Sequence, residues 1–265
     1  MFLIPVPFVL FGLYLFLVAP KKRKEMNDFK TKMYAHRGLH NAERAENSMS
    51  AFKAAVEAGY GIELDIRLSK DGELVVFHDD TLDRVCGREG KVIDFTADEL
   101  STFKLAGTDD GIPRFCDVLS MVDGQIPLLV EIKENAGDHT VSEAACKILT
   151  EYNGPYIVES FNPMSLKIVK KNMPKVTRGI LCEQYFKYEQ FRKPMFLVLQ
   201  LLLTNCLCRP AFIAFEHRHA RSLSLRFLRN FFGIPTLAWT VKSAKEEKEA
   251  RKAGFDGIIF EGYTP

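Results

Sequence analysis

The chain has 265 residues, a formal net charge of +2 and a hydrophobic fraction of 47%. This length fits one large domain or two small ones, and the composition is typical of a globular protein and excludes an intrinsically disordered one. Four of the positive charges stand together at Lys21–Lys24, so the remainder of the chain carries about −2 (+2 minus 4). No basic surface is left that would indicate nucleic acid as a partner, and no helix-turn-helix or zinc-finger spacing occurs.

The first twenty residues differ in character from the rest. Residues 2–19 carry no charge, and as a helix they would be about 27 Å long, close to the thickness of a bilayer's hydrocarbon core. Because the basic cluster follows this run, the pattern predicts a transmembrane anchor at 1–20 and a basic juxtamembrane linker at 21–32. The positive-inside rule then places residues 33–265 in the cytoplasm of a single-pass cell-membrane protein. Pro5 and Pro7 leave a shallow interfacial segment as an alternative, and a cleaved signal as another.

From Met33 onward, short apolar runs alternate with helical patterns. We expect strands at 33–36, 62–68, 74–77, 127–133, 156–161, 176–182, 211–216, 235–241 and 257–261. We expect helices at 48–58, from 96, at 118–122, from 140, and at 164–171, 195–203, 222–232 and 243–254, with caps at Ser48, Thr96, Thr140 and Ser243. This alternation is typical of parallel βαβ units. Eight of these nine strands forming such units favour the α/β class and a closed (β/α)8 TIM barrel. No glycine-rich phosphate loop opens a helix, which argues against a nucleotide-binding open sheet.

Two parts of the chain depart from this regular alternation. Residues 81–116 are too long for a simple loop, and we interpret them as a small, partly helical insertion over one end of the barrel. The last strand has almost no helix after it, so the barrel would be one helix short. The sequence does not indicate what covers that gap.

Charged side chains gather where the expected strands end. In a barrel of this kind, functional groups collect at the carboxyl ends of the strands. Here those positions hold His36, Arg37, Glu63, Asp65, His78, Asp79, Glu131, Lys133, Glu159 and Trp239. Taken singly, each has a structural alternative, such as a hydrogen-bonded histidine or a solvated strand face. Glu63 and Asp65 are two residues apart and therefore share one face of their strand.

Three acids inside a barrel mouth need a counter-charge, and a hard divalent cation such as Mg²⁺ or Ca²⁺ binds carboxylate ligands. No cluster of cysteine or histidine has zinc spacing. Arg37 and Lys133 suit a phosphate group, while His36 and His78 can divide the roles of general acid and general base near neutral pH. Together with a metal that polarises phosphoryl oxygens, this set indicates cleavage of a phosphodiester.

Seven motifs in this order resemble the glycerophosphodiester phosphodiesterase family: "AHRG", "ENS", "ELDIRLSKDGELVVFHDDTLDR", "IPRFCDVL", "LLVEIK", "SFNP" and "WTV". The resemblance covers the chain from Met33 to its C-terminus. It implies a (β/α)8 barrel over 33–265 with an insertion after the second strand, here 81–116. It also implies hydrolysis of a glycerophosphodiester to glycerol 3-phosphate and an alcohol, by a route in which the glycerol 2-hydroxyl attacks phosphorus before water completes the reaction.

The resemblance assigns the site residues one by one. It implies that Glu63, Asp65 and Glu131 bind one divalent cation, Mg²⁺ or Ca²⁺, and that His36 and His78 are the acid and base. It implies contacts with the substrate by Arg37, Lys133, Glu46, Phe161 and Trp239. Ser48, where the family usually has Thr, is a mild departure, and Glu216 replaces a smaller or amide residue in a way that would alter the alcohol pocket.

The apolar stretch 195–203 is too short to span a bilayer and carries only one polar residue, Gln200. It is either a helix buried under another element or a dimer contact, or a membrane-facing patch that would suit a lysophospholipid substrate. A lysophospholipase D on the same site is therefore an alternative function. Further alternatives are a catalytically silent membrane-bound binding or scaffold barrel, and a metal-independent phosphoinositide-type phospholipase that uses two histidines. The head group and the oligomeric state are left open.

Overall fold

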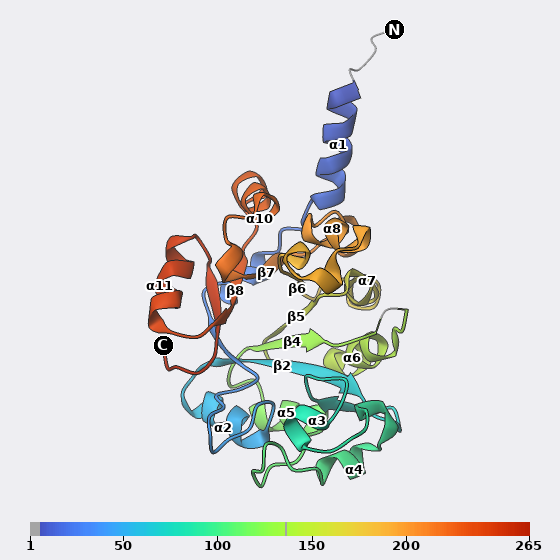
Figure 1. Cartoon of the computed structure of the whole chain (residues 1–265), viewed down its shortest axis with the longest axis vertical. Coiled ribbons are helices and arrows are strands. Elements are labelled where there is room, and N and C mark those ends of the chain that lie inside the picture. Colours follow the sequence, from blue (N-terminus) through green and yellow to red (C-terminus); the bar gives the residue numbers. More distant parts are fainter. Residues whose placement is uncertain (1–5, 136) are drawn as a thin grey trace.

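The computed structural model of the chain describes residues 6–135 and 137–265, and within them the strands form one closed sheet with helices outside it (Figure 1). Strand β1 pairs in parallel with both β2 and β9, which closes a ring of eight parallel strands, and β3 adds to β2 in antiparallel orientation. This confirms the expected (β/α)8 TIM barrel. The strands are β1 (Met33–His36), β2 (Gly61–Leu68), β3 (Leu74–Val76), β4 (Leu128–Ile132), β5 (Tyr156–Ser160), β6 (Arg178–Cys182), β7 (Phe212–Glu216), β8 (Thr236–Val241) and β9 (Gly257–Phe260).

The helices start where short polar side chains can cap them. Ser48, Thr96 and Ser243 accept hydrogen bonds from backbone N–H groups of the first helical turn, as expected. Thr140 is instead the first residue of its helix. His139 stands at the N-cap without a side-chain capping bond, and Asp138 accepts hydrogen bonds from the backbone N–H and hydroxyl of Thr140. The α-helices are α1 (Val6–Val18), α2 (Met49–Glu57), α3 (Asp83–Cys86), α4 (Ala97–Ser101), α5 (Phe115–Val122), α6 (Thr140–Glu151), α7 (Pro163–Asn172), α8 (Pro194–Gln200), α9 (Asn205–Cys208), α10 (Leu223–Phe227) and α11 (Ala244–Lys252).

Short helical turns complete the chain and help to close the barrel. The 3₁₀ turn η1 (Lys24–Asp28) inserts Met26, which is 1% exposed, among the inward-facing side chains of the strands. Burying such a side chain stabilises the fold by about 1.5–3 kcal/mol. The other turns are η2 (Val92–Asp94), η3 (Tyr185–Lys187), η4 (Glu189–Phe191), η5 (His217–His219) and the π-helical turn η6 (Leu228–Phe232).

The segment between β3 and α5 forms a small unit with its own apolar cluster. Helices α3 and α4 and the turn η2 pack through side chains such as Leu82, Val92 and Leu100. Isolated β-bridges join Thr81 to Lys91 and Lys104 to Gly111. This unit is the partly helical excursion expected from the sequence, and α5, which begins at Phe115, packs beside α2 as a barrel helix.

The outer face of the last strand is covered by aromatic side chains rather than by a helix. The ring of Phe260 in β9 lies 5.0 Å from that of Tyr60, which follows α2, and 5.7 Å from that of Tyr263. The Tyr60 hydroxyl donates to the backbone oxygen of Pro265 at 3.0 Å. Residues after β9 thus pack next to Tyr60 and the outer face of Phe260.

The expectation of a transmembrane anchor, and with it a single-pass protein of the cell membrane, is wrong. Helix α1 has 13 residues, a length of about 20 Å. No helix in the described part of the chain is long and apolar enough to cross a bilayer. The end of α1 is held by the barrel, because Asn205 donates to the oxygen of Val18 at 3.1 Å and Arg209 to that of Phe16 at 2.8 Å. The cytoplasmic placement of the catalytic domain rested on the anchor and falls with it. Residues 1–5 of the predicted anchor lie outside the described residues.

The connection from β6 to β7 is the most irregular in the barrel. It contains η3, η4, α8 and α9, and the short helix α9 packs against α7 in the outer layer. Helix α8 has no buried residue, although its sequence is apolar. The helix expected over 195–203 ends at Gln200; Met195 is 60% exposed, whereas Leu202 is buried.

Candidate active site

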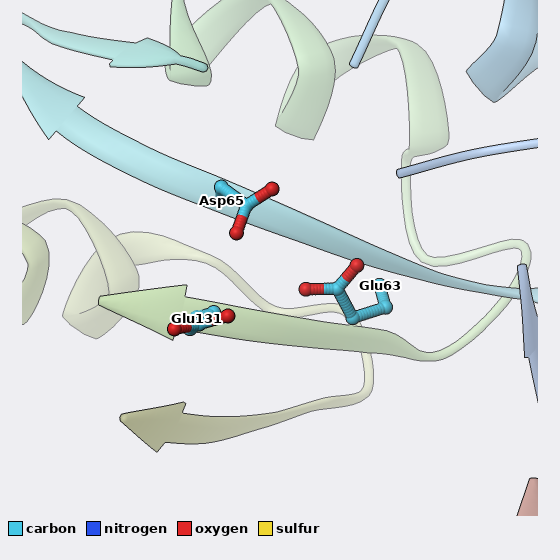
Figure 2. A group of neighbouring side chains, drawn as sticks. All are labelled: Glu63, Asp65 and Glu131. Atoms are coloured by element: carbon cyan, nitrogen blue, oxygen red, sulfur yellow. The ribbon is translucent and has the colours of Figure 1, made fainter. Parts of the chain in front are cut away.

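Three carboxylates converge at one side of the barrel mouth (Figure 2). Glu63 and Asp65 project from the same face of β2, and Asp65 lies in register with Glu131 on the neighbouring strand β4. One ligand atom of each lies within 4.8 Å of the others, and all three side chains are buried. The strand alternation predicted from the sequence thus brings the three expected metal ligands together.

The electrostatics of this cluster favour a bound cation. Burial, followed by the charges of Asp65 and Glu131, raises the pKa of Glu63 well above its usual range. Burial likewise raises the pKa of Glu131 to about 7. Burial opposes ionisation of Asp65 as well, but Lys133 and other nearby cations outweigh it and hold the pKa of that carboxyl well below its usual range. An all-oxygen set with surplus negative charge fits a hard divalent ion, so these residues could hold one.

A fourth buried acid extends the cluster onto β5. Glu159 lies in register with Glu131 and is 1% exposed. Its Oε2 has no hydrogen-bond partner among the described residues. Burial, then the charges of Glu131 and Glu63, raises the pKa of Glu159 well above its usual range. The sequence places this glutamate at a strand end, but no role for it was predicted.

Two cations face the acids from the same mouth. The Lys133 Nζ lies 2.8 Å from Glu131 Oε1 and 3.2 Å from Asp65 Oδ1. The Arg37 guanidinium contacts Glu46 at 2.7 Å and Asp65 at 3.5 Å, and the Arg37 backbone N–H donates to Glu63. The cations therefore stand beside the candidate metal ligands, where a phosphate would also have to bind.

The turn after β1 explains why the chain reads His-Arg-Gly at this point. Arg37 has a φ of 56° and Gly38 a φ of 82°, so both lie in the left-handed region. A Cβ at Gly38 would meet Phe52 at 2.9 Å, and only glycine fits between the turn and α2. The tight turn directs the backbone N–H of Arg37 toward Glu63 instead of continuing the strand.

Each histidine is paired with a carboxylate through Nδ1. His36 Nδ1 lies 2.7 Å from Glu261 Oε2, and His78 Nδ1 lies 2.6 Å from Asp79 Oδ1. The carboxylates fix the ring orientations, and with Nδ1 as the donor the Nε2 atoms are left to act elsewhere. Burial lowers the pKa of His36, and burial also lowers that of His78, to about 4. The Nε2 of His36 lies 3.9 Å from Glu63.

Most of the predicted site residues line one cavity of about 100 Å³. Eight of them do so: His36, Arg37, Glu63, His78, Glu131, Lys133, Phe161 and Trp239. The other two, Asp65 and Glu46, do not line the cavity but contact Lys133 and Arg37, which do.

Aromatic side chains form the opposite wall of this cavity. The rings of Phe161 and Trp239 meet edge to face at 5.5 Å, and the Lys133 Nζ lies 5.8 Å from the Phe161 ring centre. The Trp239 Nε1 is buried and has no hydrogen-bond partner in residues 6–135 and 137–265. This donor is therefore available to a bound ligand.

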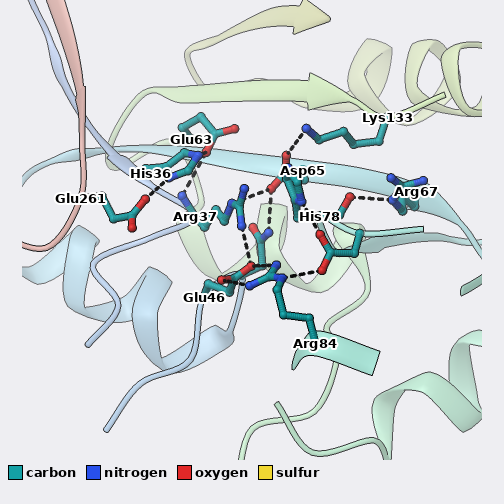
Figure 3. A network of polar contacts seen from close by, with 12 residues as sticks. His36, Arg37, Glu46, Glu63, Asp65, Arg67, His78, Arg84, Lys133 and Glu261 are labelled. Atoms are coloured by element: carbon teal, nitrogen blue, oxygen red, sulfur yellow. Dashed lines mark hydrogen bonds and ion pairs between the residues drawn. The ribbon is translucent and has the colours of Figure 1, made fainter. Parts of the chain in front are cut away.

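Sequence reasoning placed Asp79 at a strand end but assigned no partners to the two histidines or to Glu46 (Figure 3). Glu261, at the end of β9, pairs with His36, and Asp79 pairs with His78. Arg84, from the insertion, contacts Glu46 at 2.7 Å and Asp79 at 2.6 Å. Glu261 directly follows the last strand, and this position could have identified it as a residue of the barrel mouth. Nothing in the local sequence around Arg84 indicates its contacts.

Comparisons with known proteins agree on one family. A sequence model described as the glycerophosphoryl diester phosphodiesterase family matches residues 36–262. A glycerophosphodiester phosphodiesterase from Caldanaerobacter subterraneus subsp. tengcongensis is 34% identical over 244 residues, which cover 87% of this chain and 93% of that protein.

Solved structures are similar across nearly the whole barrel. The glycerophosphodiester phosphodiesterase of Thermotoga maritima is 28% identical with a TM-score of 0.68, covering 87% of this chain and 94% of its own. A phosphodiesterase of Oleispira antarctica, solved with the product sn-glycerol-3-phosphate, is 21% identical with a TM-score of 0.71, covering 88% and 94%. At 21% identity, the similarity to the Oleispira antarctica structure is informative about the fold only.

Proposed function

The chain belongs to the glycerophosphoryl diester phosphodiesterase family, and on that premise we propose that it hydrolyses glycerophosphodiesters to glycerol 3-phosphate and an alcohol. The family resemblance expected from the sequence is confirmed, and with it the expectation of an enzyme. The observation that carries the proposal for this site is the convergence of Glu63, Asp65 and Glu131 beside two carboxylate-paired histidines on one cavity.

We propose that Glu63, Asp65 and Glu131 bind one divalent cation, Mg²⁺ or Ca²⁺. When bound, such an ion polarises the phosphoryl oxygens and favours ionisation of the attacking hydroxyl. The raised pKa values of Glu63 and Glu131 support this assignment, since a cation would relieve the repulsion that raises them. Their oxygen-only chemistry argues against zinc.

Arg37 and Lys133 are proposed to bind the phosphate. Both are half-buried cations with carboxylate partners, so their charges are held in place before the substrate arrives. A preorganised positive charge stabilises the negative charge that grows on the phosphoryl oxygens in the transition state. Trp239, whose N–H has no partner in the described residues, and Phe161 would contact the organic part of the substrate.

His36 and His78 are proposed to share the proton transfers. One Nε2 takes the proton of the attacking hydroxyl, which in the implied route is the 2-hydroxyl of the glycerol, and the other gives a proton to the leaving alcohol oxygen. Burial lowers the pKa of both rings, so the neutral form predominates near pH 7 in the free protein. The histidine that acts as the acid would gain its proton with the anionic phosphodiester bound.

Hydrolysis of glycerophosphocholine in ¹⁸O-labelled water tests the function directly. We expect choline and glycerol 3-phosphate, with the label in the phosphate, because water enters at phosphorus and the P–O bond to choline breaks. A silent binding or scaffold barrel would bind the phosphodiester without releasing either product. Release of labelled choline would contradict attack at phosphorus.

A further inference from the structure

Arg84, in helix α3 of the insertion, joins two parts of the barrel mouth that lie far apart in the sequence. Its Nε donates to Asp79 Oδ2 at 2.6 Å, and its Nη1 and Nη2 donate to the two oxygens of Glu46 at 2.8 Å and 2.7 Å (Figure 3). Glu46 precedes α2, whereas Asp79 follows β3. One planar guanidinium therefore fixes the positions of two carboxylates that come from different loops.

Each of these carboxylates bonds in turn to a residue that is proposed to act on the substrate. Asp79 Oδ1 lies 2.6 Å from His78 Nδ1, and Glu46 Oε1 accepts from Arg37 Nη1 at 2.7 Å. Neither Arg84 nor its two carboxylate partners line the catalytic cavity, whereas His78 and Arg37 do. We therefore expect Arg84 to influence the reaction through these two residues rather than by touching the substrate.

The contacts of Arg84 differ from those of an ordinary surface ion pair. Its side chain is 51% exposed, and an isolated exposed pair contributes little. The side chains of Glu46 and Asp79, however, are only 18% and 23% exposed, and three N–H groups of one rigid guanidinium bind them. Burial raises the pKa of both carboxyls, but the hydrogen bonds from Arg84 and their other cationic partners outweigh it and hold both pKa values below the usual range.

The packing of the insertion places the same side chains. Leu82 and Val85, on either side of Arg84, are buried in the apolar cluster of the insertion. This cluster also contains the residues that directly precede Glu46 and His78 in the sequence. They are Ala45 and Phe77. The insertion thus packs against both of the backbone segments that Arg84 joins.

We propose that Arg84 is a positioning residue that couples proton transfer to phosphate binding. It holds His78 in place through Asp79, and it holds Arg37 in place through Glu46. The inference rests on the proposed function, which gives these two residues their roles. Without Arg84 the two carboxylates lose the cation that they share, and each can turn away from the residue that it orients.

The first test compares Arg84→Ala with Arg88→Ala in the hydrolysis of glycerophosphocholine. Arg88 is the matched control, because it is an exposed arginine of the same insertion that packs on the ring of Phe103, 3.6 Å from its centre. In Arg84→Ala, kcat should fall by about 10- to 100-fold, as is typical when an orienting partner is lost. Binding of glycerol 3-phosphate, measured by calorimetry, should also weaken. Equal losses in the two variants would mean that a loosened insertion explains the effect, and would overturn the proposal.

Arg84→Lys and chemical rescue separate orientation from charge. Lysine keeps the positive charge, but its ammonium lacks the planar fork that matches a carboxylate, so Arg84→Lys should keep most of the loss in kcat. Guanidinium ion, at concentrations that do not unfold the protein, should restore part of kcat in Arg84→Ala and leave Arg88→Ala unchanged. Full activity in Arg84→Lys would reduce the role of Arg84 to its charge and overturn the positioning role.

Double variants test whether Arg84 acts through its two partners. Asp79→Asn should lower kcat in the wild type and have a much smaller effect in Arg84→Ala. Glu46→Gln should likewise weaken the binding of glycerol 3-phosphate in the wild type and have a much smaller effect in Arg84→Ala. If the losses multiply in both pairs, the residues act independently and the coupling is overturned.

A readout without catalysis separates this inference from the proposed function. With Nδ1 as the donor, the His78–Asp79 hydrogen bond should give a downfield ¹H NMR signal in ¹⁵N-histidine-labelled protein, assigned by its absence from His78→Gln. The signal should persist in Arg88→Ala and be lost in Arg84→Ala. If this occurs in a protein that does not cleave glycerophosphocholine, the positioning role stands and the proposed function is wrong. If the wild type cleaves this substrate and Arg84→Ala changes neither the signal nor kcat, the proposed function stands and this inference is overturned.

Discussion

The two sides of the barrel mouth are built from opposite chemistry. On the side of β1, β2 and β4, buried and half-buried ionisable side chains contact one another at 2.6 Å to 3.5 Å and hold the histidines and cations in fixed positions. On the side of α7 and α8, aromatic and aliphatic side chains enclose a cavity of about 630 Å³ that they do not fill. The charged side holds more carboxylates than cations, and a bound cation would balance this surplus. The apolar side has room for part of a ligand. The two sides meet at Phe161, which lines both the catalytic cavity and the apolar one.

The largest effect is expected on the charged side, from Glu63→Gln. The change removes one of three candidate metal ligands, and kcat/KM should fall by on the order of 10³ or more. Because burial and two neighbouring acids already raise the pKa of Glu63, a neutral amide there should not destabilise the protein in EDTA. Activity and thermal melting with and without Mg²⁺ check both parts, with Glu57→Gln on the exposed side of α2 as the control. Full activity in Glu63→Gln would remove this residue from the metal site.

The next largest effect is expected from His78→Gln. Loss of a general acid or base costs about 10²–10⁴ in rate, and kcat should fall while binding of glycerol 3-phosphate persists. His139→Gln is the matched control, because His139 pairs with Glu134 and does not line the catalytic cavity. A rate for His78→Gln equal to that of the control would exclude His78 from proton transfer.

Glu261→Gln should have an intermediate effect, because Glu261 is a positioning residue that acts through His36. Loss of the oriented carboxylate should lower kcat by about 10- to 100-fold. The hydrogen bond and charge of Glu261 raise the pKa of His36 against the effect of burial, so their loss lowers that pKa further. The limb of the pH profile of kcat/KM that follows His36 should therefore move to lower pH, whether the ring acts as acid or base. Glu249→Gln, on the exposed side of α11, should leave the profile in place.

The smallest effect concerns stability and involves Glu159. A carboxyl whose pKa is raised in the folded state binds more protons folded than unfolded, so stability falls as pH rises from the usual pKa of glutamate toward the folded value. At high pH, each pKa unit by which the folded value exceeds the unfolded one lowers the free energy of unfolding by about 1.4 kcal/mol. For a domain of this size, each kcal/mol lowers Tm by roughly 2–4 °C. In EDTA, Glu159→Gln should melt higher than the wild type at pH 8, and by less at pH 5. If Glu159→Gln raised Tm equally at both pH values, ionisation of the Glu159 carboxyl would not destabilise the folded protein.

The parts of the site that the sequence predicts are those encoded by strand alternation. Glu63, Asp65 and Glu131 share a face because residues two apart on a strand do so, and the parallel register of β2 and β4 brings them together. The partnership of His36 with Glu261 requires closure of the ring between β1 and β9, which joins residues 225 positions apart. Arg84 reaches Glu46 only because the insertion folds back over the mouth, and short-range patterns do not specify that.

The apolar segments show the other limit of sequence reasoning. An uncharged run of 18 residues predicts a membrane-spanning helix, yet α1 ends at Val18, where Asn205 and Arg209 contact its last carbonyl groups and their neighbours. The run 195–203 is apolar except for Gln200, and its pattern alone does not distinguish a buried helix from an exposed one. The cavity beneath α8 depends on how η3, η4 and α9 pack, which are long-range contacts.

The most direct test of the central claim is hydrolysis of glycerophosphocholine by protein stripped with EDTA and then titrated with Mg²⁺ or Ca²⁺. If Glu63, Asp65 and Glu131 hold a catalytic divalent ion, the stripped enzyme has no activity above background, and activity returns as one ion binds per chain. Unchanged activity in the stripped protein, with metal content verified to be zero, would contradict this account and favour a reaction carried out by the two histidines and the cations alone.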